Sequence, residues 1–189
     1  MLKIGEYSMR PIEKKDLEQV LAWRNSERIR SVMFSDQIIT MQEHLAWFER
    51  IKRLEIPVHF VFEYKNRPIG YISYSDIDKR SLTCSSGTYL GEQAEIPELA
   101  GIILQFFTTQ YAFEKLGMRK IWAYSFAYNK KIKKLDKLFG CQQEGRLKQH
   151  ILKNGKYEDL DIMSLFYDDW KSKREVLQRY LFPEANMPN

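Results

Sequence analysis

One long helix limits the folds open to this chain more than any other segment does. Residues 98–116 are rich in apolar residues, and Gly117 follows them where a helix C-cap belongs. Segments with the alternating pattern of strands come before this helix, and another, residues 120–126, comes after it. A helix set among strands in this order predicts an α+β or mixed α/β fold with one central sheet.

Further strands and helices complete this order. Alternation predicts strands at residues 7–12, 57–64, 68–75, 82–90, 142–153 and 157–166. Apolar spacing predicts helices at residues 14–24, 40–54, 129–139 and 169–181. Thr40 and Glu43 form a capping box at the second of these helices, and Asn154-Gly155 is a strong two-residue hairpin signal. We therefore expect a twisted, mostly antiparallel sheet of about seven strands flanked by helices.

Length and cysteine content set the broad class. The 189 residues suit one domain, which we expect over residues 1–181, with a loose tail at residues 182–189. Cys84 and Cys141 lie far apart and lack the spacing of a metal or redox site, so we expect no metal and a reducing, cytoplasmic location. We expect neither a signal peptide nor a membrane-spanning run, because the apolar stretches are too short or interrupted.

The chain is basic, with a net charge of +5 and a pI of about 9.1. This balance suits a polyanionic small molecule as well as nucleic acid. No recognised nucleic-acid motif accompanies the charge, so we expect neither nucleic acid nor a membrane as a partner. The run Lys130, Lys131, Lys133 and Lys134 has two readings: a solvated helix face, or a surface that partly faces an anionic ligand.

Four stretches of this sequence resemble the GNAT superfamily of N-acetyltransferases, and together they span nearly the whole chain. The first is Met9-Arg10-Pro11-Ile12 with Asp16-Leu17, and the third is Gly87-Thr88-Tyr89-Leu90-Gly91 on the fourth predicted strand. The fourth joins Asn129 and its helix to residues 144–148, 153–157 and Asp159. The resemblance implies a GNAT fold and an acetyl-coenzyme A-dependent N-acetyltransferase that works by direct attack in a ternary complex.

The second stretch is the most specific. It consists of Trp23-Arg24-Asn25-Ser26, then Met33-Phe34, then Glu43-His44-Leu45-Ala46-Trp47-Phe48. This stretch is similar to the N-acetyltransferases of pseudaminic acid biosynthesis. That likeness implies acetyl transfer to the 4-amine of a nucleotide sugar, UDP-4-amino-4,6-dideoxy-N-acetyl-β-L-altrosamine.

The resemblance also implies where acetyl-coenzyme A, the co-substrate, would bind. Its pantetheine arm would pair with the backbone of the fourth strand, and its pyrophosphate would lie on the loop before the long helix. That loop departs from the family's glycine-rich pattern, because Glu95 and Glu98 would oppose the phosphates. Without the resemblance, residues 88–90 read equally well as core strand and Asn129 as an ordinary N-cap. The cofactor-binding residues we expect are Tyr89, Leu90, Gly91, Leu99, Ala100, Gly101, Asn129 and Lys131.

Direct attack needs a group that takes the amine proton, a donor for the thioester oxygen and an acid for the leaving thiolate. In many GNATs the acid is a tyrosine in the helix after the asparagine, but the matching residue here is Asp136, which would need a strongly raised pKa. Tyr124 is an alternative acid, or else a packed aromatic residue. Ser73 could relay a proton through water, or be an ordinary strand residue. Tyr124, Ser73 and Asp136 are thus the candidate catalytic residues.

The acceptor pocket would come from the first two helices and their connecting loop. Arg24 and Asn25 can bind phosphate or hydroxyl groups, and the arginine fork suits a diphosphate. An apolar wall would suit a 6-deoxy sugar and a nucleobase, and His44 could bind phosphate or act on the amine. The plainer reading makes the aromatic residues core and His44 structural. The substrate-binding residues we expect are Arg24, Asn25, Met33, Phe34, His44, Trp47 and Tyr89.

Two other functions stay open at this point. The chain could acetylate another amine, such as a protein N-terminus, a polyamine or an aminoglycoside, or it could be a non-enzymatic GNAT-like binding protein. Polyamine and aminoglycoside enzymes should present carboxylates to their acceptors, whereas the acceptor loop here carries Arg24, Arg28 and Arg30. These arginines favour an anionic acceptor. The sequence leaves a homodimer open.

Overall fold

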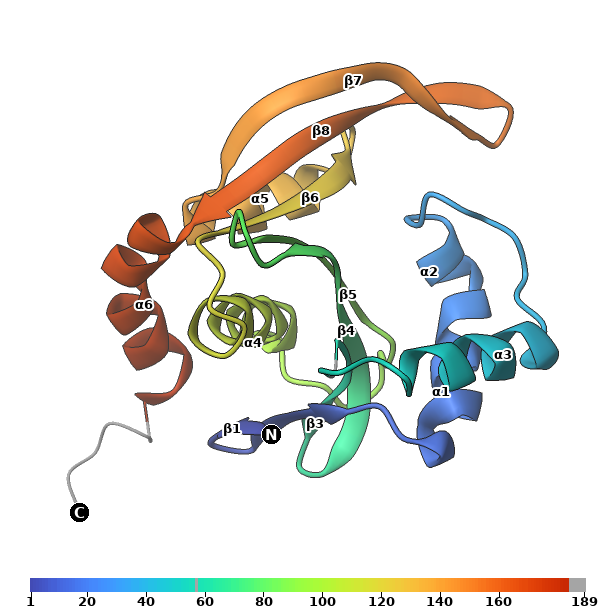
Figure 1. The fold of residues 1–189 in the computed structure, drawn as a ribbon, viewed down its shortest axis with the longest axis horizontal. Helices are drawn as coiled ribbons and strands as arrows, with labels where there is room; N and C mark the ends of the chain where they lie inside the picture. The colour runs from blue at the N-terminus through green and yellow to red at the C-terminus, as the bar shows by residue number, and fades with distance from the viewer. Residues whose placement is uncertain (57, 184–189) are drawn as a thin grey trace. The chain divides into compact units, whose positions relative to one another are not determined.

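The computed structural model describes residues 1–56 and 58–183 (Figure 1). Within them the chain divides into two compact units that interleave along the sequence. The first unit holds Met1–Tyr74 and Gly87–Gln105, and the second holds Ser75–Ser86 and the residues from Phe106 on. The expectation of a single domain over residues 1–181 stays a prediction. The expected tail lies mostly outside the described residues, as does the expected strand start at position 57.

The predicted elements are confirmed with small shifts at their ends. The strands are β1 (Leu2–Ile4), β2 (Tyr7–Pro11), β3 (His59–Tyr64), β4 (Arg67–Asp78), β5 (Thr83–Leu90), β6 (Lys120–Phe126), β7 (Gln142–Lys153) and β8 (Lys156–Phe166). The helices are the 3-10 turn η1 (Lys14–Asp16), α1 (Leu17–Asn25), α2 (Glu27–Arg30), α3 (Met41–Ile51), α4 (Ala100–Glu114), α5 (Lys130–Phe139) and α6 (Tyr167–Leu181). Sequence reasoning missed β1 and α2, because neither is long enough to show a period.

Hydrogen-bonded strands follow the order β1-β2-β3-β4-β5-β6-β8-β7. The pairs β1–β2, β2–β3, β3–β4, β6–β8 and β7–β8 are antiparallel. Strands β5 and β6 pair in parallel, with Thr83–Ser85 beside Lys120–Trp122. The mixed, mostly antiparallel sheet is therefore confirmed, with β1 as an additional strand.

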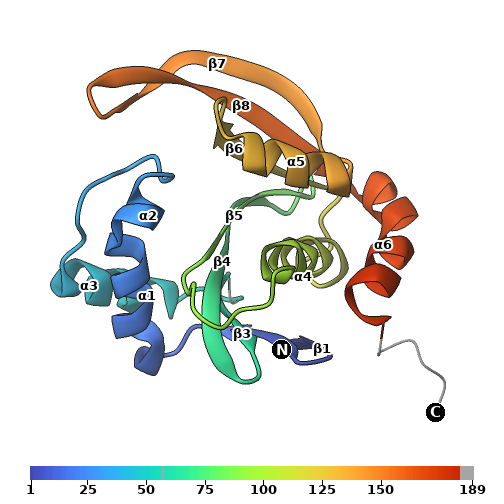
Figure 2. The same ribbon diagram turned by 180° about the vertical axis from the view of Figure 1, so that it is seen from behind.

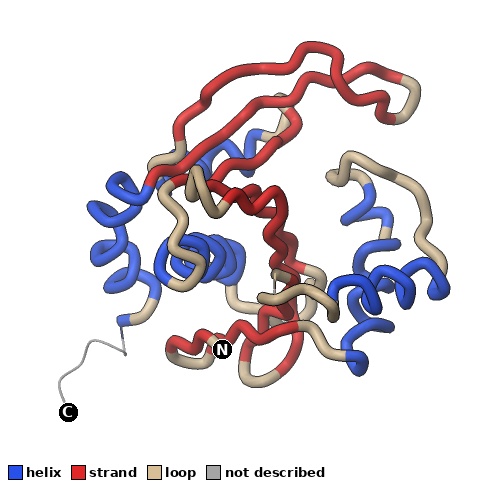
Figure 3. Tube along the Cα trace, in the orientation of Figure 1, coloured by secondary structure: helices blue, strands red, loops and turns tan. Residues whose placement is uncertain are grey.

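Both expected turns join antiparallel strands. Lys65 and Asn66 have φ angles of 50° and 61° between β3 and β4. Asn154 and Gly155 have φ angles of 50° and 76° between β7 and β8. Two consecutive positive φ angles are the backbone that a two-residue hairpin needs, and asparagine and glycine tolerate it best. The second turn closes the long β7–β8 hairpin, whose two strands are the long red tubes joined by a tan turn in Figure 3.

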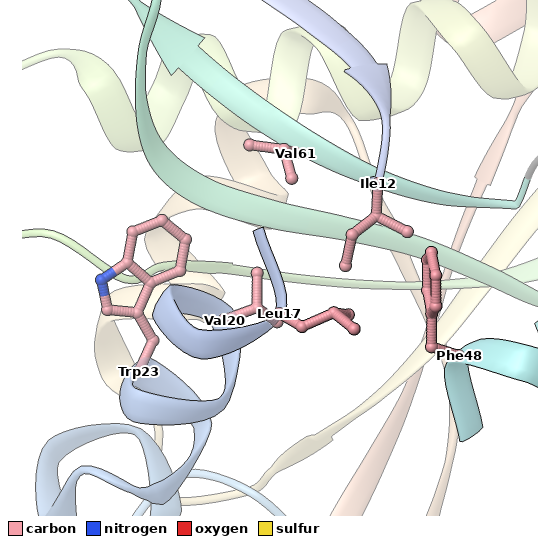
Figure 4. Packing of buried hydrophobic residues seen from close by; sticks show 6 residues of the cluster. All are labelled: Ile12, Leu17, Val20, Trp23, Phe48 and Val61. Carbon is pink, nitrogen blue, oxygen red and sulfur yellow. The ribbon is translucent and has the colours of Figure 1, made fainter. Parts of the chain in front are cut away.

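In the first unit, α1 and α3 lie side by side against β3 (Figure 1). The buried cluster between these helices and the sheet is shown in Figure 4 and consists of Ile12, Leu17, Val20, Trp23, Phe48 and Val61. The apolar spacing of α1 places Leu17, Val20 and Trp23 on the covered face. Burial of each of these side chains contributes roughly 1.5–3 kcal/mol to the free energy of unfolding. This packing fixes the C-terminal end of α1, where Arg24 and Asn25 lie.

The second unit packs around Trp170, which is fully buried on α6. Its ring stacks on Phe139 of α5 at a centroid distance of 6.1 Å and meets Phe106 of α4 edge-on at 5.1 Å. Figure 2 shows α4 and α6 next to one another from behind. Gly140 ends α5 with a φ of 86°, as its sequence position predicted.

A buried ion network ties the start of α1 to the sheet. Arg10 on β2 donates to both carboxylate oxygens of Asp16 at 2.7 and 2.8 Å and to Glu63 on β3 at 2.8 Å. Ser8 donates to Glu63 at 2.7 Å, and the Glu13 backbone donates to Asp16 at 2.8 Å. Burial by itself raises the pKa of Asp16, but the hydrogen bonds from Arg10 and Glu13 outweigh it and leave that pKa below its usual value.

We expect Arg10→Ala to destabilise the fold by about 3–5 kcal/mol, because it leaves two buried carboxylates without their cation. Urea unfolding measures this loss. Lys15→Ala is the matched control, since its ion pair with Glu13 is exposed, and it should change stability by less than about 1 kcal/mol. Because the folded pKa of Asp16 is lowered, the wild-type stabilisation is present above about pH 4 and is lost as the pH falls further. Equal losses in the two variants would contradict the network's role.

Candidate active site

The end of β5 is held by α1 and α2. Arg28 on α2 donates to the backbone carbonyls of Leu90 and Gly91 at 3.0 and 2.5 Å. The Gly91 N–H donates to the Ile69 carbonyl on β4 at 2.9 Å. A Cβ atom on Gly91 would overlap the indole ring of Trp23, so this position requires glycine. The residue after β5 thus packs directly against Trp23 of α1.

The loop between β5 and α4 is braced by Arg67 on β4. Its guanidinium donates to the carbonyls of Ala94 and Glu95 at 2.8 and 3.0 Å and lies 3.5 Å from the Glu95 carboxylate. This ion pair weakens the repulsion that the Glu95 carboxylate would exert on a pyrophosphate. The Ala100 N–H donates to the Pro97 carbonyl at 2.9 Å, and proline has no N–H. These two positions therefore offer a phosphate no free backbone donor.

The helix after Asn129 begins as expected. The Asn129 side-chain oxygen accepts from the Ile132 N–H at 3.2 Å, which is an N-cap contact. The amide NH2 of the same side chain has no partner in the described part of the chain, so a cap and a ligand contact are compatible. Lys133 pairs with the buried carboxylate of Asp161 at 2.7 Å, whereas Lys131 is exposed. The lysine run thus divides between a structural ion pair and a solvated face.

Asp136 is half-buried on α5. Burial raises its pKa to about 6, while a hydrogen bond from the Cys141 thiol opposes the shift. A carboxyl with this pKa is mostly ionised at pH 7 and is a poor proton donor to a thiolate. Tyr124 on β6 is 39% exposed, and its ring meets Trp122 edge-on at 5.2 Å. Of the two candidate acids, Tyr124 is the more accessible.

Arg24 and Asn25 face the loop of residues 31–40. Both polar atoms of the Asn25 amide pair with the backbone of Ile39, at 2.8 and 2.9 Å. This side chain therefore holds the loop, a role that the sequence interpretation did not anticipate. Arg24 donates from Nη2 to the Ser35 carbonyl at 3.0 Å. Its Nη1 atom is buried and has no partner among the described residues.

The remaining acceptor-side residues differ in exposure. Phe34 is 40% exposed on the loop, whereas Trp47 is partly buried and packs on the core cluster. His44 is buried and stacks on Trp47 at a ring distance of 4.8 Å. Burial lowers the pKa of His44, and a bond to the Leu17 backbone only partly offsets this. The geometry of His44 fits the structural reading.

Sequence reasoning missed a pair on β3 and β4. The Nδ1 atom of His59 lies 2.6 Å from the Tyr71 hydroxyl. Burial lowers the pKa of His59 to about 4 and raises that of Tyr71. Tyr71 stacks on Tyr89 at 5.3 Å, and Trp47 meets His59 edge-on at 5.2 Å. Pairing the strands across the turn at 65–67 would have placed His59 opposite Ser73, since these residues are register partners.

Ser73 donates to the Gly87 carbonyl on β5 at 3.3 Å. It lies in the first unit with the acceptor-side residues and with the residues expected to bind the cofactor before α4. The members of this group are Arg24, Asn25, Met33, Phe34, His44, Trp47, Ser73, Tyr89, Leu90, Gly91, Leu99, Ala100 and Gly101. The second unit holds Tyr124, Asn129, Lys131 and Asp136.

Two absences apply to the described residues. No helix among residues 1–56 and 58–183 is long and apolar enough to cross a membrane. In the same part of the chain, no three His, Cys, Asp or Glu side chains gather as a metal site would require.

Comparison with known proteins gives a family match. A family model described as an acetyltransferase (GNAT) domain matches residues 8–142. The chain is similar to the acetyltransferase PseH of Campylobacter jejuni subsp. jejuni serotype O:23/36 (strain 81-176), with 28% identity over 137 residues, 71% of this chain and 81% of the relative. The acetyltransferase PseH of serotype O:2 is 27% identical over the same shares.

Solved structures share the fold. A spermidine N-acetyltransferase from Vibrio cholerae, in complex with CoA and spermine, is 20% identical with a TM-score of 0.82, over 88% of this chain and 98% of that one. An N-acetyltransferase from Staphylococcus aureus Mu50 is 24% identical with a TM-score of 0.73, over 86% and 99%. At these identities the likeness confirms the predicted GNAT fold.

We expect Gly91→Ala to destabilise the fold by about 1–3 kcal/mol, because the added methyl group must displace the Trp23 ring or the strand. Urea unfolding without ligands measures the loss. Gly101→Ala is the control: its Cβ would make an ordinary contact at 3.7 Å with Leu90, and alanine suits a helix better than glycine. Unchanged stability in Gly91→Ala would show that α1 is not packed on β5 as described.

Proposed function

Because the chain belongs to the acetyltransferase (GNAT) family, we propose that it transfers the acetyl group of acetyl-coenzyme A to the 4-amine of a UDP-linked 4-amino-4,6-dideoxy sugar. The amine attacks the thioester directly, with both substrates bound. The likeness of the second sequence stretch to the enzymes of pseudaminic acid biosynthesis supports this acceptor, as does the similarity to acetyltransferase PseH.

The observation that carries the proposal is the state of Arg24. Its guanidinium has a buried Nη1 with no partner, and no carboxylate of the described residues forms an ion pair with it. Burial lowers the pKa of Arg24, and the neighbouring Arg30 lowers it further, while Tyr89 opposes the shift. A half-buried cation with a buried donor left unpaired is costly, and a phosphate oxygen of the acceptor would satisfy that donor.

Arg28 adds to the same positive field. It donates to the Leu90 and Gly91 carbonyls, so its charge meets neutral acceptors there. A polyamine is a cation, and a site built for it would need carboxylates where this chain has Arg24 and Arg28. The acceptor side is therefore better matched to an anion. Tyr89 and Trp47 offer ring faces for an apolar sugar carbon or a nucleobase.

We propose that acetyl-coenzyme A binds along the backbone of residues 89–91 and at the start of α4, with Asn129 and Lys131 as further contacts. Pairing with pantetheine amides resembles the addition of a strand. The Glu95 and Glu98 carboxylates remain unfavourable to a pyrophosphate, although Arg67 offsets the first of them. The thioester supplies the acetyl group, and the chain's own groups orient the amine and move protons.

The experiment on the acceptor compares KM values for the UDP-amino sugar. We expect Arg24→Ala to raise this KM by about tenfold to a hundredfold, the range for losing charged hydrogen bonds, with a small change in kcat. Arg50→Ala removes an exposed arginine of α3 and should leave KM unchanged within about twofold. An unchanged KM in Arg24→Ala, or no transfer to the nucleotide sugar by the wild type, would contradict the proposed acceptor.

A second experiment concerns the acid for the leaving thiolate. We propose Tyr124 in this role, and we expect Tyr124→Phe to lower kcat more than Asp136→Asn does, on the order of 10²-fold against a few-fold. The measurement is steady-state turnover with the release of free thiol as the signal. The opposite ranking would remove Tyr124 as the acid and favour Asp136.

A further inference from the structure

We propose that Tyr71 and His59 form a proton relay, in which the Tyr71 hydroxyl takes the proton of the acceptor nitrogen and passes its own to Nδ1 of His59. Tyr71 is the catalytic residue of the pair, and His59 is a positioning residue that acts through it. The inference rests on acetyl transfer to an amine, which the proposed function assumes, but not on which amine that is.

The geometry of the pair carries the inference. The 2.6 Å contact between His59 Nδ1 and the Tyr71 hydroxyl is short for a neutral hydrogen bond and joins neighbouring strands. His59 is the register partner of Ser73, and Tyr71 lies two residues before Ser73, so all three side chains share one face of the sheet. That face is the one covered by α1 and α3, next to the acceptor-side residues.

Aromatic rings hold the pair in place. Tyr89 stacks on Tyr71 at 5.3 Å, and Trp47 meets His59 edge-on at 5.2 Å. Burial raises the pKa of Tyr89, and the charge of Arg24 near the other side of the row partly opposes that rise. Neither His59 nor Tyr71 contacts a carboxylate among the described residues. The pair is therefore a neutral, oriented hydrogen bond, and Tyr89 lies between it and the charge of Arg24.

The electrostatics of the pair suit a late proton transfer. With a pKa of about 4, His59 is a neutral imidazole at pH 7, and the relay uses its Nε2–H tautomer, in which the Nδ1 lone pair accepts from Tyr71. Burial raises the pKa of Tyr71, so the phenol keeps its proton until it receives a second one from the acceptor nitrogen. An imidazole this weakly basic takes a proton only from a strong acid. The acceptor nitrogen becomes one when its bond to the acetyl carbon has formed.

The atoms and charges balance as follows. The amine lone pair forms the C–N bond, and the thioester C=O electron pair moves to oxygen. The N–H proton goes to Tyr71 Oη as the Tyr71 proton goes to His59 Nδ1, which leaves an imidazolium. The intermediate then re-forms C=O, the C–S bond breaks, and the thiolate takes a proton from its own acid. His59 releases its extra proton to water and the acid regains one from water, so the enzyme returns to its starting state and the products are the amide and free coenzyme A.

Kinetics of conservative variants test the relay. The enzyme variants are Tyr71→Phe, His59→Gln and the double variant, assayed with whichever amine the wild type acetylates fastest. Glutamine can still accept the Tyr71 hydrogen bond but cannot take its proton. We expect each single variant and the double variant to lose about the same kcat, on the order of 10²-fold, with KM for acetyl-coenzyme A within about twofold. His150→Gln, an exposed histidine on β7, is the control and should keep its activity.

Three results would overturn the relay. These are kcat losses below about threefold in the single variants, a double variant whose loss equals the product of the single losses, or a His59 whose Nδ1 carries the proton in the resting enzyme. The last is read from 15N NMR of the imidazole ring without any turnover. Transfer to an amine other than the nucleotide sugar would contradict the proposed acceptor alone, since the same variants can be assayed with that amine.

Discussion

The contact between Arg10, Asp16 and Glu63 is the interaction on which the acceptor side depends. It joins β2 and β3 to the turn that begins α1, and it does so with buried charges that have little freedom to move. From that fixed start, α1 extends to Trp23, whose ring packs against Gly91, the residue after β5. The helix is thereby held at both ends. Arg24 is the next residue, and its position is set by these contacts of α1 and by its hydrogen bond to the Ser35 carbonyl of the loop.

Arg24 and Arg28 hold parts of the fold together and keep their positive charge. Arg28 and Arg24 donate to backbone carbonyls, which are satisfied without neutralising the positive charge. An ion pair with a carboxylate would have cancelled it. The loop of residues 31–40 and the end of β5 are thus held by groups that keep their charge, as the proposed anionic acceptor requires. The same choice disfavours a cationic acceptor.

Much of the fold could be predicted from the sequence, because its signals are local. The Thr40–Glu43 capping box, the Gly140 C-cap and the Asn154-Gly155 turn each fix a boundary within a few residues. The contacts of the candidate site were harder to predict. The sequence suggests that the Asn25 amide binds a ligand, whereas in the structure it pairs with the backbone of Ile39. The His59–Tyr71 pair is formed only because of the register of β3 and β4. Such partners are distant in sequence, and no period or motif reports them.

A competition assay is the most direct test of which amine this enzyme acetylates. Equal concentrations of the UDP-linked 4-amino-4,6-dideoxy sugar and spermidine share one limiting supply of acetyl-coenzyme A, and mass spectrometry counts both products. The ratio of products gives the ratio of kcat/KM values. We expect the nucleotide sugar to take nearly all of the acetyl groups, by about a hundredfold or more, because Arg24 attracts its diphosphate and repels the cationic spermidine. A preference for spermidine, or equal products, would contradict it.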